Sequence, residues 1–229
     1  MLYTEENVRD NLRNRDGKRV FFLGKEDKLT SAARDFLHRE RIPILPAEQA
    51  KIHTYRLSGG GFLTEKPEHM THLHGNVLVS KTHPRIAFRG AMDTLEAERM
   101  LCPLVVDKKL GDSLMEILNF ARLLLRCEVL DEPVSQEKLC GLTPQQLREH
   151  SHQPQDFYNQ PHFMPQASDG EAILRLNRCR CAAREAELWA VEAFTDKEGN
   201  PVRSDILQAM NRLSSMLYIL MIRCKADRK

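Results

Sequence analysis

The stretch Ser204–Cys224, SDILQAMNRLSSMLYILMIRC, decides the fold of the C-terminal part of this chain. Its apolar residues recur at intervals of three and four, which is the period of one face of an α-helix. These apolar residues are Ile206, Met210, Leu213, Leu217, Leu220 and Cys224. A neighbouring face is partly polar and carries Asn211, Ser215 and Tyr218. Because an apolar helix face must be covered by other helices, the stretch predicts a helical bundle.

Two more helices are predicted upstream, after Pro84. Met92, Leu95 and Met100 mark the first of them. The second follows Pro103 and has apolar residues at helical spacing, namely Leu110, Leu114, Ile117, Leu118, Ala121 and Leu125.

Start and stop signals predict where the remaining helices lie. Thr143 is a candidate N-cap, with Pro144 at the first helical position and Gln146 at the third, which predicts a short helix to about His150. The run Ser168–Glu171 predicts a capping box at the start of a longer helix, and Gly199–Pro201 predicts the break before the last one. The sequence therefore predicts a mainly α fold, with a four- or five-helix bundle over residues 84–229.

Residues 1–57 have a different pattern and predict a small α/β extension. Thr4 and Thr30 or Ser31 are candidate helix caps, and Val20–Leu23 is a candidate strand. Ile42–Leu45 is expected to be an edge strand, because its proline cannot donate to a neighbouring strand. Residues 58–83 contain a glycine triplet and several histidines, and we expect them to form a linker or a ligand loop.

Composition excludes several classes of function. Lys and Arg number 34 against 32 Asp and Glu, so the net charge of +2 gives no field that would attract nucleic acid or an anionic membrane. Six cysteines form no CxxC pair, and the charged start has no signal peptide, which predicts reduced thiols in the cytoplasm. No apolar run approaches the length of about 18 residues that a membrane span requires. We expect a soluble protein without nucleic-acid or membrane partners.

One helix carries a line of charge formed by Arg180, Arg184 and Glu187. Residues four and seven apart lie on the same helix face. Two guanidinium groups along one line suit an oligophosphate or a carboxylate, because their planar donors keep their charge at working pH. The same pattern is typical of a solvated face with salt bridges, so the stripe by itself leaves both interpretations open.

Three segments resemble the motifs of one enzyme family, the PduO-type corrinoid adenosyltransferases. Val79–Ile86 and Gly90–Glu96 are similar to its V-S-K, P-R-I and D-x-L segment, and the charged stripe is similar to its second motif. Met210–Ser214 resembles its third motif, L-N-R-L-S. Leu29–Arg34 and His152–Pro154 are similar to segments of the ethanolamine-utilisation branch. The resemblance covers about residues 62 to 224 and implies a cobalamin adenosyltransferase-like bundle.

The resemblance also implies an activity, which is transfer of the 5′-deoxyadenosyl group of ATP to the cobalt of reduced cob(I)alamin. The product, adenosylcobalamin, would serve ethanolamine ammonia-lyase. The implied catalytic residues are Arg180, Arg184 and Asp93, with Asp93 pairing Arg180 across a subunit boundary. The implied ATP-binding residues are Lys66, Thr71, Lys81, Arg184, Glu187 and Asn211. A homotrimer with interfacial sites is implied, with Mg²⁺ bridging phosphates and without a metal site made by protein ligands.

The corrinoid site and the phosphate loop are less well defined by the resemblance. The family places an aromatic residue beside a proline before the charged helix, which selects Phe163 here, although an offset of one residue would select His162. The glycine-rich phosphate loop of the family is replaced by Lys66–Thr71, and no cysteine precedes Cys102, so the metal-binding cysteine cluster of some ethanolamine-type members is absent. Three closely spaced histidines, His69, His72 and His74, lack the accompanying ligands of a zinc site.

A second function from another class stays open at this point. The chain would then be a non-catalytic helical adaptor, or a corrinoid- or nucleotide-binding component, of a bacterial microcompartment. The missing loop glycines favour this alternative. The retained charged residues favour the enzyme, because charges that are buried without partners are costly. In either case a reductase and microcompartment proteins are possible partners, and the chain would act in the cytoplasm or inside a microcompartment.

Overall fold

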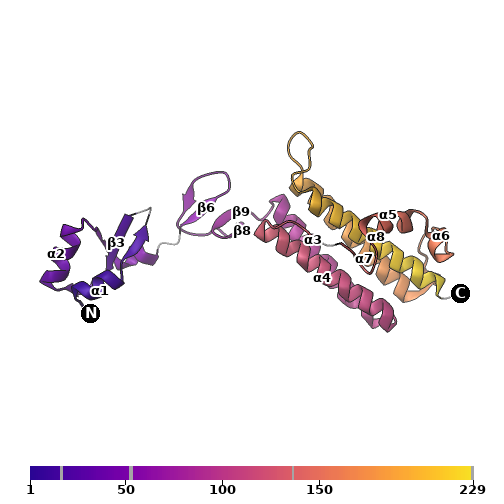
Figure 1. The fold of residues 1–229 in the computed structure, drawn as a ribbon, viewed down its shortest axis with the longest axis horizontal. Coiled ribbons are helices and arrows are strands. Elements are labelled where there is room, and N and C mark those ends of the chain that lie inside the picture. Colours follow the sequence, from indigo (N-terminus) through magenta and orange to yellow (C-terminus); the bar gives the residue numbers. More distant parts are fainter. Residues whose placement is uncertain (16–17, 52–53, 136, 228–229) are drawn as a thin grey trace. The chain divides into compact units, whose positions relative to one another are not determined.

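The structure, a computed structural model, describes residues 1–15, 18–51, 54–135 and 137–227 (Figure 1). The chain divides into two compact units, Met1–Pro67 and Glu68–Lys229. This boundary falls inside residues 58–83, which the sequence predicted to be one linker or ligand loop. Residues 58–67 belong to the first unit, whereas residues 68–83 belong to the second and contain a β-hairpin.

The first unit is a small α/β fold, as predicted. Its elements in chain order are β1 (Leu2–Tyr3), α1 (Glu5–Asp10), β2 (Arg13–Arg15), β3 (Lys18–Leu23), β4 (Lys28–Leu29), α2 (Ser31–Arg39), β5 (Ile44–Pro46), the 3₁₀ helix η1 (Ala47–Lys51), β6 (Tyr55–Leu57) and β7 (Phe62–Leu63). Strand β3 pairs antiparallel with β2 and parallel with β5, so β5 lies at a sheet edge, as expected, although it begins at Ile44, after Pro43. Its core consists of Val8, Phe21, Ala33, Phe36, Leu37 and Ile42.

The second unit begins with a β-hairpin of β8 (Met70–His74) and β9 (Val77–Ser80), which pair antiparallel. Gly75 has a φ of 48° at the turn, a conformation that glycine adopts without strain. Val77, Leu78 and Val79 are buried. This hairpin is ordered because its short apolar run packs inward. The polar and histidine-rich residues around that run make it hard to recognise in the sequence.

Four long helices form the described body of this unit: α3 (Pro84–Leu101), α4 (Lys108–Leu130), α7 (Gly170–Phe194) and α8 (Ser204–Ala226). The 3₁₀ turns η2 (Cys102–Leu104) and η3 (Ala167–Asp169) precede α4 and α7. Two short helices, α5 (Pro144–His152) and α6 (Pro154–Tyr158), pack against α8. The predicted mainly α bundle is confirmed, and α6 is a further short helix that follows the predicted helix α5.

Helix α7 is the centre of the bundle because it packs along both α3 and α8. Its buried residues include the small side chains Ala182, Ala183, Ala186 and Ala190, which let two neighbouring helices approach closely. The apolar residues predicted for α8 are fully buried from Ile206 to Leu220, and Cys224 is half-buried. A helix covered on two sides leaves only a narrow exposed stripe, and on α7 this stripe includes Arg184 and Leu188.

The helix caps agree with the sequence in all but one case. Thr4, Thr30 and Thr143 each accept a hydrogen bond from the backbone as N-caps. The capping box expected at Ser168–Glu171 was wrong. Asp169 instead accepts from the backbone N–H of Gln166 and pairs with Lys225, so its carboxylate closes the 3₁₀ turn before α7.

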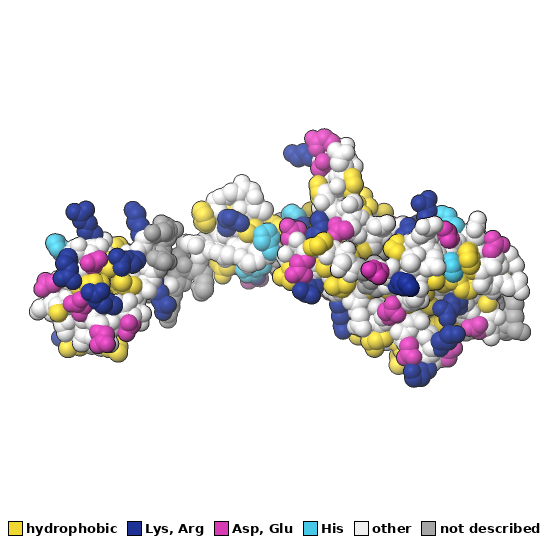
Figure 2. Space-filling model, in the orientation of Figure 1, with side chains coloured by type: hydrophobic (Ala, Val, Ile, Leu, Met, Phe, Trp, Pro, Cys, Tyr) yellow, Lys and Arg dark blue, Asp and Glu magenta, His cyan; other side chains and the backbone are white. Residues whose placement is uncertain are grey.

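The surface agrees with the small net charge. Figure 2 shows Lys and Arg side chains intermingled with Asp and Glu over the visible face of the helical unit, without one dominant patch. Within the described residues, no helix combines the length and the apolar character that crossing a membrane requires.

Candidate active site

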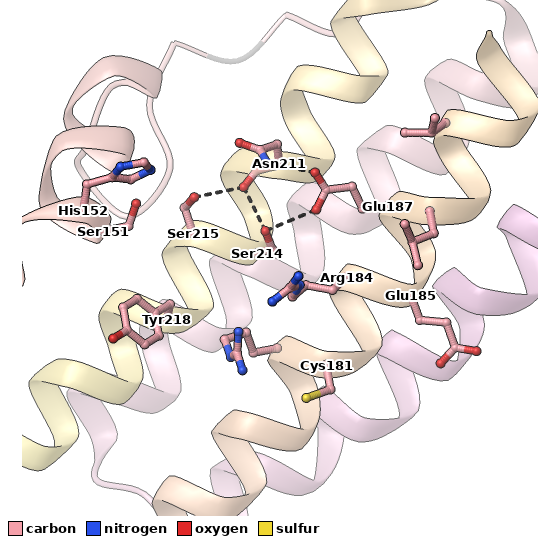
Figure 3. Close-up of a pocket in the computed structure, with 13 residues that line it drawn as sticks. Ser151, His152, Cys181, Arg184, Glu185, Glu187, Asn211, Ser214, Ser215 and Tyr218 are labelled. Atoms are coloured by element: carbon pink, nitrogen blue, oxygen red, sulfur yellow. Dashed lines mark hydrogen bonds between the residues drawn. The ribbon is translucent and has the colours of Figure 1, made fainter. Parts of the chain in front are cut away.

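The charged stripe of α7 lines a cavity of about 690 Å³ in the groove between α7 and α8 (Figure 3). A volume of this size is typical of small-molecule sites. Helix α7 contributes Arg180, Cys181, Arg184, Glu185, Glu187, Leu188 and Val191; α8 contributes Asn211, Ser214, Ser215 and Tyr218; and the end of α5 contributes Ser151 and His152. The partly polar face predicted for α8 is therefore a wall of this cavity.

Glu187 and Asn211 join the two long walls of the cavity. The amide nitrogen of Asn211 donates to Glu187 Oε1 at 2.8 Å, and the Ser214 hydroxyl lies 3.5 Å from the other carboxylate oxygen. Asn211 Oδ1 accepts in turn from Arg212. Because each group orients the next, the Glu187 carboxylate and the Asn211 amide are held in one arrangement before any ligand arrives.

Arg180 and Tyr218 form the far end of the cavity. Arg180 donates to Asn177 Oδ1 at 3.1 and 3.3 Å, and its guanidinium carbon lies 5.8 Å from the centre of the Tyr218 ring. Burial raises the pKa of Tyr218, while the backbone N–H of Phe163 and the charge of Arg180 oppose that shift. Tyr218 is therefore a neutral aromatic surface at working pH, with a cation beside it.

His162 connects this end of the cavity to the segment after α6. Its Nδ1 lies 2.7 Å from the Tyr218 hydroxyl, and its Nε2 lies 3.0 Å from the carbonyl oxygen of His152. A carbonyl oxygen only accepts, so Nε2 carries a proton, and in a neutral imidazole Nδ1 then accepts from Tyr218. His162 thus fixes both the segment and the phenol that it contacts.

Arg184 differs from the other charged residues of the cavity. It is exposed, it extends from α7 toward α8, and no hydrogen bond or ion pair to it is found among the described residues (Figure 3). Its five N–H donors are therefore available to a ligand. A guanidinium with free donors in a groove that holds a second arginine, Arg180, favours an anionic group such as a phosphate.

A second cavity, of about 590 Å³, adjoins the first and shares Glu185 and Leu188 with it. Its other lining residues are Thr82, Pro84, Trp189 and Glu192. Lys81 directly precedes Thr82 and is exposed, so the V-S-K motif comes next to this second cavity without lining the first. Sequence reasoning had placed Lys81 and Arg184 at a common site, whereas in this chain Lys81 is not among the described residues that line the Arg184 cavity.

The remaining predicted residues lie elsewhere within this chain. Asp93 is exposed on α3, and among the described residues no hydrogen bond or ion pair joins it to Arg180, which the prediction assigned to a different subunit. Thr71 lies on β8, and Lys66 belongs to the first unit. Phe163 packs its ring against the helical core, with the Lys225 ammonium 4.5 Å from the ring centre, so the side chain of His162, rather than that of Phe163, contacts the cavity residue Tyr218.

Sequence reasoning did not select several residues that line the cavity. Ser151 and His152 come from the short helix α5, and Cys181 is exposed on α7. Tyr218, Ser214 and Ser215 had a usable signal, because they follow Asn211 at spacings of three, four and seven on α8. No local pattern connects α5 to this site, since its position depends on packing against α8.

Among the described residues, no cluster of three His, Cys, Asp or Glu side chains has the geometry of a metal site.

Comparisons with known proteins place this geometry in a family. Residues 62–224 match the sequence model of the family described as cobalamin adenosyltransferase. The chain is 34% identical over 160 residues to the corrinoid adenosyltransferase EutT of Salmonella typhimurium and 33% identical over 160 residues to that of Escherichia coli K12. Each alignment covers 70% of this chain and 60% of the relative, so the chain spans about 60% of the length of these relatives.

A solved structure shows the same fold. It is a variant PduO-type ATP:corrinoid adenosyltransferase from Lactobacillus reuteri, complexed with cobalamin and ATP, which aligns with a TM-score of 0.50 and 16% identity. The alignment covers 77% of this chain and 91% of that one. The family match extends over most of the helical unit and includes both walls of the cavity, and on this evidence the chain belongs to the cobalamin adenosyltransferase family.

Proposed function

We propose that this protein transfers the 5′-deoxyadenosyl group of ATP to the cobalt of a reduced corrinoid, giving adenosylcobalamin. The observation that carries the proposal is the cavity between α7 and α8, where Arg180, Arg184, Glu187 and Asn211 converge in a chain of this family. The relatives are named corrinoid adenosyltransferases, and the structural neighbour was solved with cobalamin and ATP.

The chemistry requires little from the protein beyond placement and charge. Cob(I)alamin carries a strongly nucleophilic cobalt, which attacks the ribose C5′ of ATP; a Co–C bond forms, the C5′–O bond breaks, and the polyphosphate leaves with the electron pair. No side chain has to act as nucleophile or base. Catalysis then comes from holding the two reactants in line and from stabilising the charge that develops on the leaving group.

Each residue of the cavity has a role in this proposal. Arg184, which is exposed and has no partner among the residues that the structure describes, binds the leaving phosphates. Asn211 and Glu187 hydrogen-bond each other and together present an amide and a carboxylate to the nucleotide. Arg180 and the Tyr218 ring face the corrinoid side, where His162 holds the phenol. Lys66, Thr71 and Lys81 are further ATP-binding residues, and Phe163 stays the corrinoid-site residue that the sequence predicts.

We further propose that the sites are completed in a homotrimer. Asp93 and Arg180 do not pair within one chain, and both are accessible enough to meet across subunits. Leu188 is 71% exposed and Val191 45%, which is unusual for apolar residues beside a charged cavity and is typical of an interface. A neighbouring subunit that covers this face would bring its own Lys81 and Asp93 toward Arg184 and Arg180.

Mg²⁺ enters this proposal as a companion of the nucleotide. The carboxylates beside the cavity, Glu185 and Glu187, together with phosphate oxygens and water, fit a cation that keeps part of its hydration shell. Bound there, Mg²⁺ would neutralise charge on the phosphates. The residues of this chain would still determine where the phosphates lie.

The physiological setting follows from the motif resemblance rather than from the fold. The ethanolamine-utilisation branch implies that the product serves ethanolamine ammonia-lyase, in the cytoplasm or inside a bacterial microcompartment, with a reductase supplying cob(I)alamin. We propose these partners in the same way as the homotrimer.

The direct test is to incubate the protein with ATP, Mg²⁺ and cob(I)alamin under a strong reductant and to follow the absorption spectrum. Formation of the Co–C bond, confirmed by its loss on exposure to light, supports the enzyme. A protein that binds ATP or cobalamin without forming this bond is instead the non-catalytic binding component or adaptor. The matched control is the same reaction mixture without the protein.

A further inference from the structure

A carboxylate that the proposed reaction does not use lies fully buried in the helical unit. Glu128 is in the last turn of α4, and its side chain is 0% exposed. Burying a carboxylate is costly unless cations and hydrogen-bond donors replace the lost water. The contacts of Glu128 therefore indicate what its burial achieves.

Two arginines from the first two turns of α3 bind this one carboxylate. Arg85 donates through Nε to Glu128 Oε1 and through Nη2 to the backbone carbonyl of Glu128 at 2.7 Å. Arg89 donates to Oε2 at 2.7 Å and to Oε1 at 3.2 Å. Both carboxylate oxygens are thus satisfied, and the start of α3 is fixed to the end of α4.

Arg89 continues the network into the β8–β9 hairpin. Its Nη2 also donates to the carbonyl of Leu73 at 2.7 Å, and its Nη1 lies 3.4 Å from the carbonyl of His72. A guanidinium can serve a carboxylate and two carbonyls at once because its donors point in fixed directions. Glu128 therefore holds α3, α4 and the hairpin together through two side chains.

The β8–β9 hairpin and α3 lie on either side of the short segment Ser80–Pro84 in the chain, and this segment includes Lys81. The Lys81 backbone N–H donates to the carbonyl of His69 at 2.9 Å, and His83 Nδ1 accepts from the backbone N–H of Arg85 at 3.2 Å. Burial lowers the pKa of His83, and the charges of Arg85 and Arg89 lower it further, so His83 stays neutral and able to accept. One end of the segment is thus bonded to His69, which directly precedes the hairpin that Arg89 contacts, and the other end is bonded to the backbone of Arg85, whose side chain binds Glu128.

We propose that Glu128 is a positioning residue, which through Arg85 and Arg89 fixes the Ser80–Pro84 segment and so places Lys81 for contact with a nucleotide polyphosphate. This inference rests on the proposed function, in which Lys81 contacts ATP. Glu128 itself touches no ligand. A network of planar, charge-assisted hydrogen bonds specifies one geometry, which an apolar contact of the same size does not.

The test uses Glu128→Gln in the full-length protein, which keeps the shape but removes the charge that holds two guanidinium groups. A displaced binding group lowers kcat/KM for ATP by roughly 10- to 100-fold. The decisive comparison is a double-mutant cycle with Lys81→Ala. If Glu128 acts through Lys81, adding Glu128→Gln to Lys81→Ala leaves KM for ATP unchanged, whereas the thermal unfolding temperature falls equally in both backgrounds.

A second measurement is made on the protein without any nucleotide. Trp189 is the single tryptophan of the chain, and it lines the same cavity as Thr82 and Pro84. Its fluorescence therefore reports the position of the segment, and we expect its emission to shift in Glu128→Gln. Arg122→Gln is the matched control, because Arg122 also links α4 to α3, through Glu96 at 3.0 Å, but does not contact the hairpin. The control should leave both the emission and KM for ATP unchanged.

If Glu128→Gln does not fold, Arg89→Lys answers the same question. Lysine keeps a positive charge beside Glu128 but lacks the fork that reaches His72 and Leu73, so the emission shift and the loss in kcat/KM for ATP should both persist. Additive effects of Glu128→Gln and Lys81→Ala, or an emission identical to the unsubstituted protein, overturn the inference. Failure of the unsubstituted protein to bind ATP overturns the proposed function instead, while the Trp189 measurement still decides whether Glu128 holds the segment.

Discussion

Replacing Arg184 with alanine separates a catalytic from a structural role more cleanly than any other substitution at this site. Arg184 lines the cavity, is exposed, and has no hydrogen-bond or salt-bridge partner among the described residues. An exposed side chain without partners contributes little to folding, so the free energy of unfolding should change by no more than about 0.5 kcal/mol. Its whole effect should appear in the reaction.

The magnitude follows from the role of a donor that stabilises a leaving group. Removing one such donor lowers kcat by about 100- to 1,000-fold, which corresponds to about 2.7 to 4 kcal/mol. Arg184→Lys should recover only part of this loss, because an ammonium cannot bind a phosphate through two parallel donors. The assay is the initial rate of Co–C bond formation at saturating ATP, measured together with urea unfolding of each variant.

Arg178→Ala is the matched control. Arg178 lies on the same helix but pairs with Glu98 of α3 at 2.9 Å and does not line the cavity. Its substitution should leave kcat unchanged. If Arg184→Ala turns over at the unsubstituted rate, the assignment of Arg184 to the leaving phosphates is refuted. If its free energy of unfolding falls together with kcat, the Arg184 side chain also has a structural role.

Three further predictions concern assembly and stability. Leu188→Arg should convert the proposed trimer to monomers in light scattering without lowering the unfolding temperature, and a persistent trimer would exclude this face as the interface. Leu213→Ala removes a fully buried side chain from α8 and should cost about 2 to 5 kcal/mol in urea unfolding. Hydrogen bonding to Arg203 lowers the pKa of Asp205 to about 2, so this pair stabilises the fold above pH 4, and the contribution disappears as the pH falls through 2. Asp205→Asn should therefore lose about 1 to 2 kcal/mol at neutral pH, after allowance for solvent screening, and the difference should vanish once the pH is well below the pKa of about 2.

The helices were predictable because their signals are local. The caps at Thr30 and Thr143 depend on residues three positions away, and the apolar face of α8 repeats within a single turn. The same holds for the charged stripe of α7, whose three members share a face by helix geometry alone. The hairpin after Pro67 was missed because its apolar run is only a few residues long and lies among polar residues.

The residues that complete the cavity could not be predicted in this way. Ser151 and His152 reach it because α5 packs on α8, and the prediction of Phe163 for the corrinoid site depended on an alignment offset that local sequence could not resolve. The position of His162 beside Tyr218 is a contact across 56 positions in the chain. A one-residue offset in a loop leaves composition unchanged but exchanges which side chain enters the core.

From its own residues, then, the chain determines a helical bundle with a small α/β unit before it, and a helix that carries two arginines and a glutamate on one face. The tertiary structure decides that Asn211 meets Glu187, that Arg184 stays unpaired, and that Glu128 holds two arginines of another helix. The reason is physical: helical periodicity and capping act between residues three or four positions apart, whereas these contacts depend on which helices pack together, and burial of the whole core selects that packing.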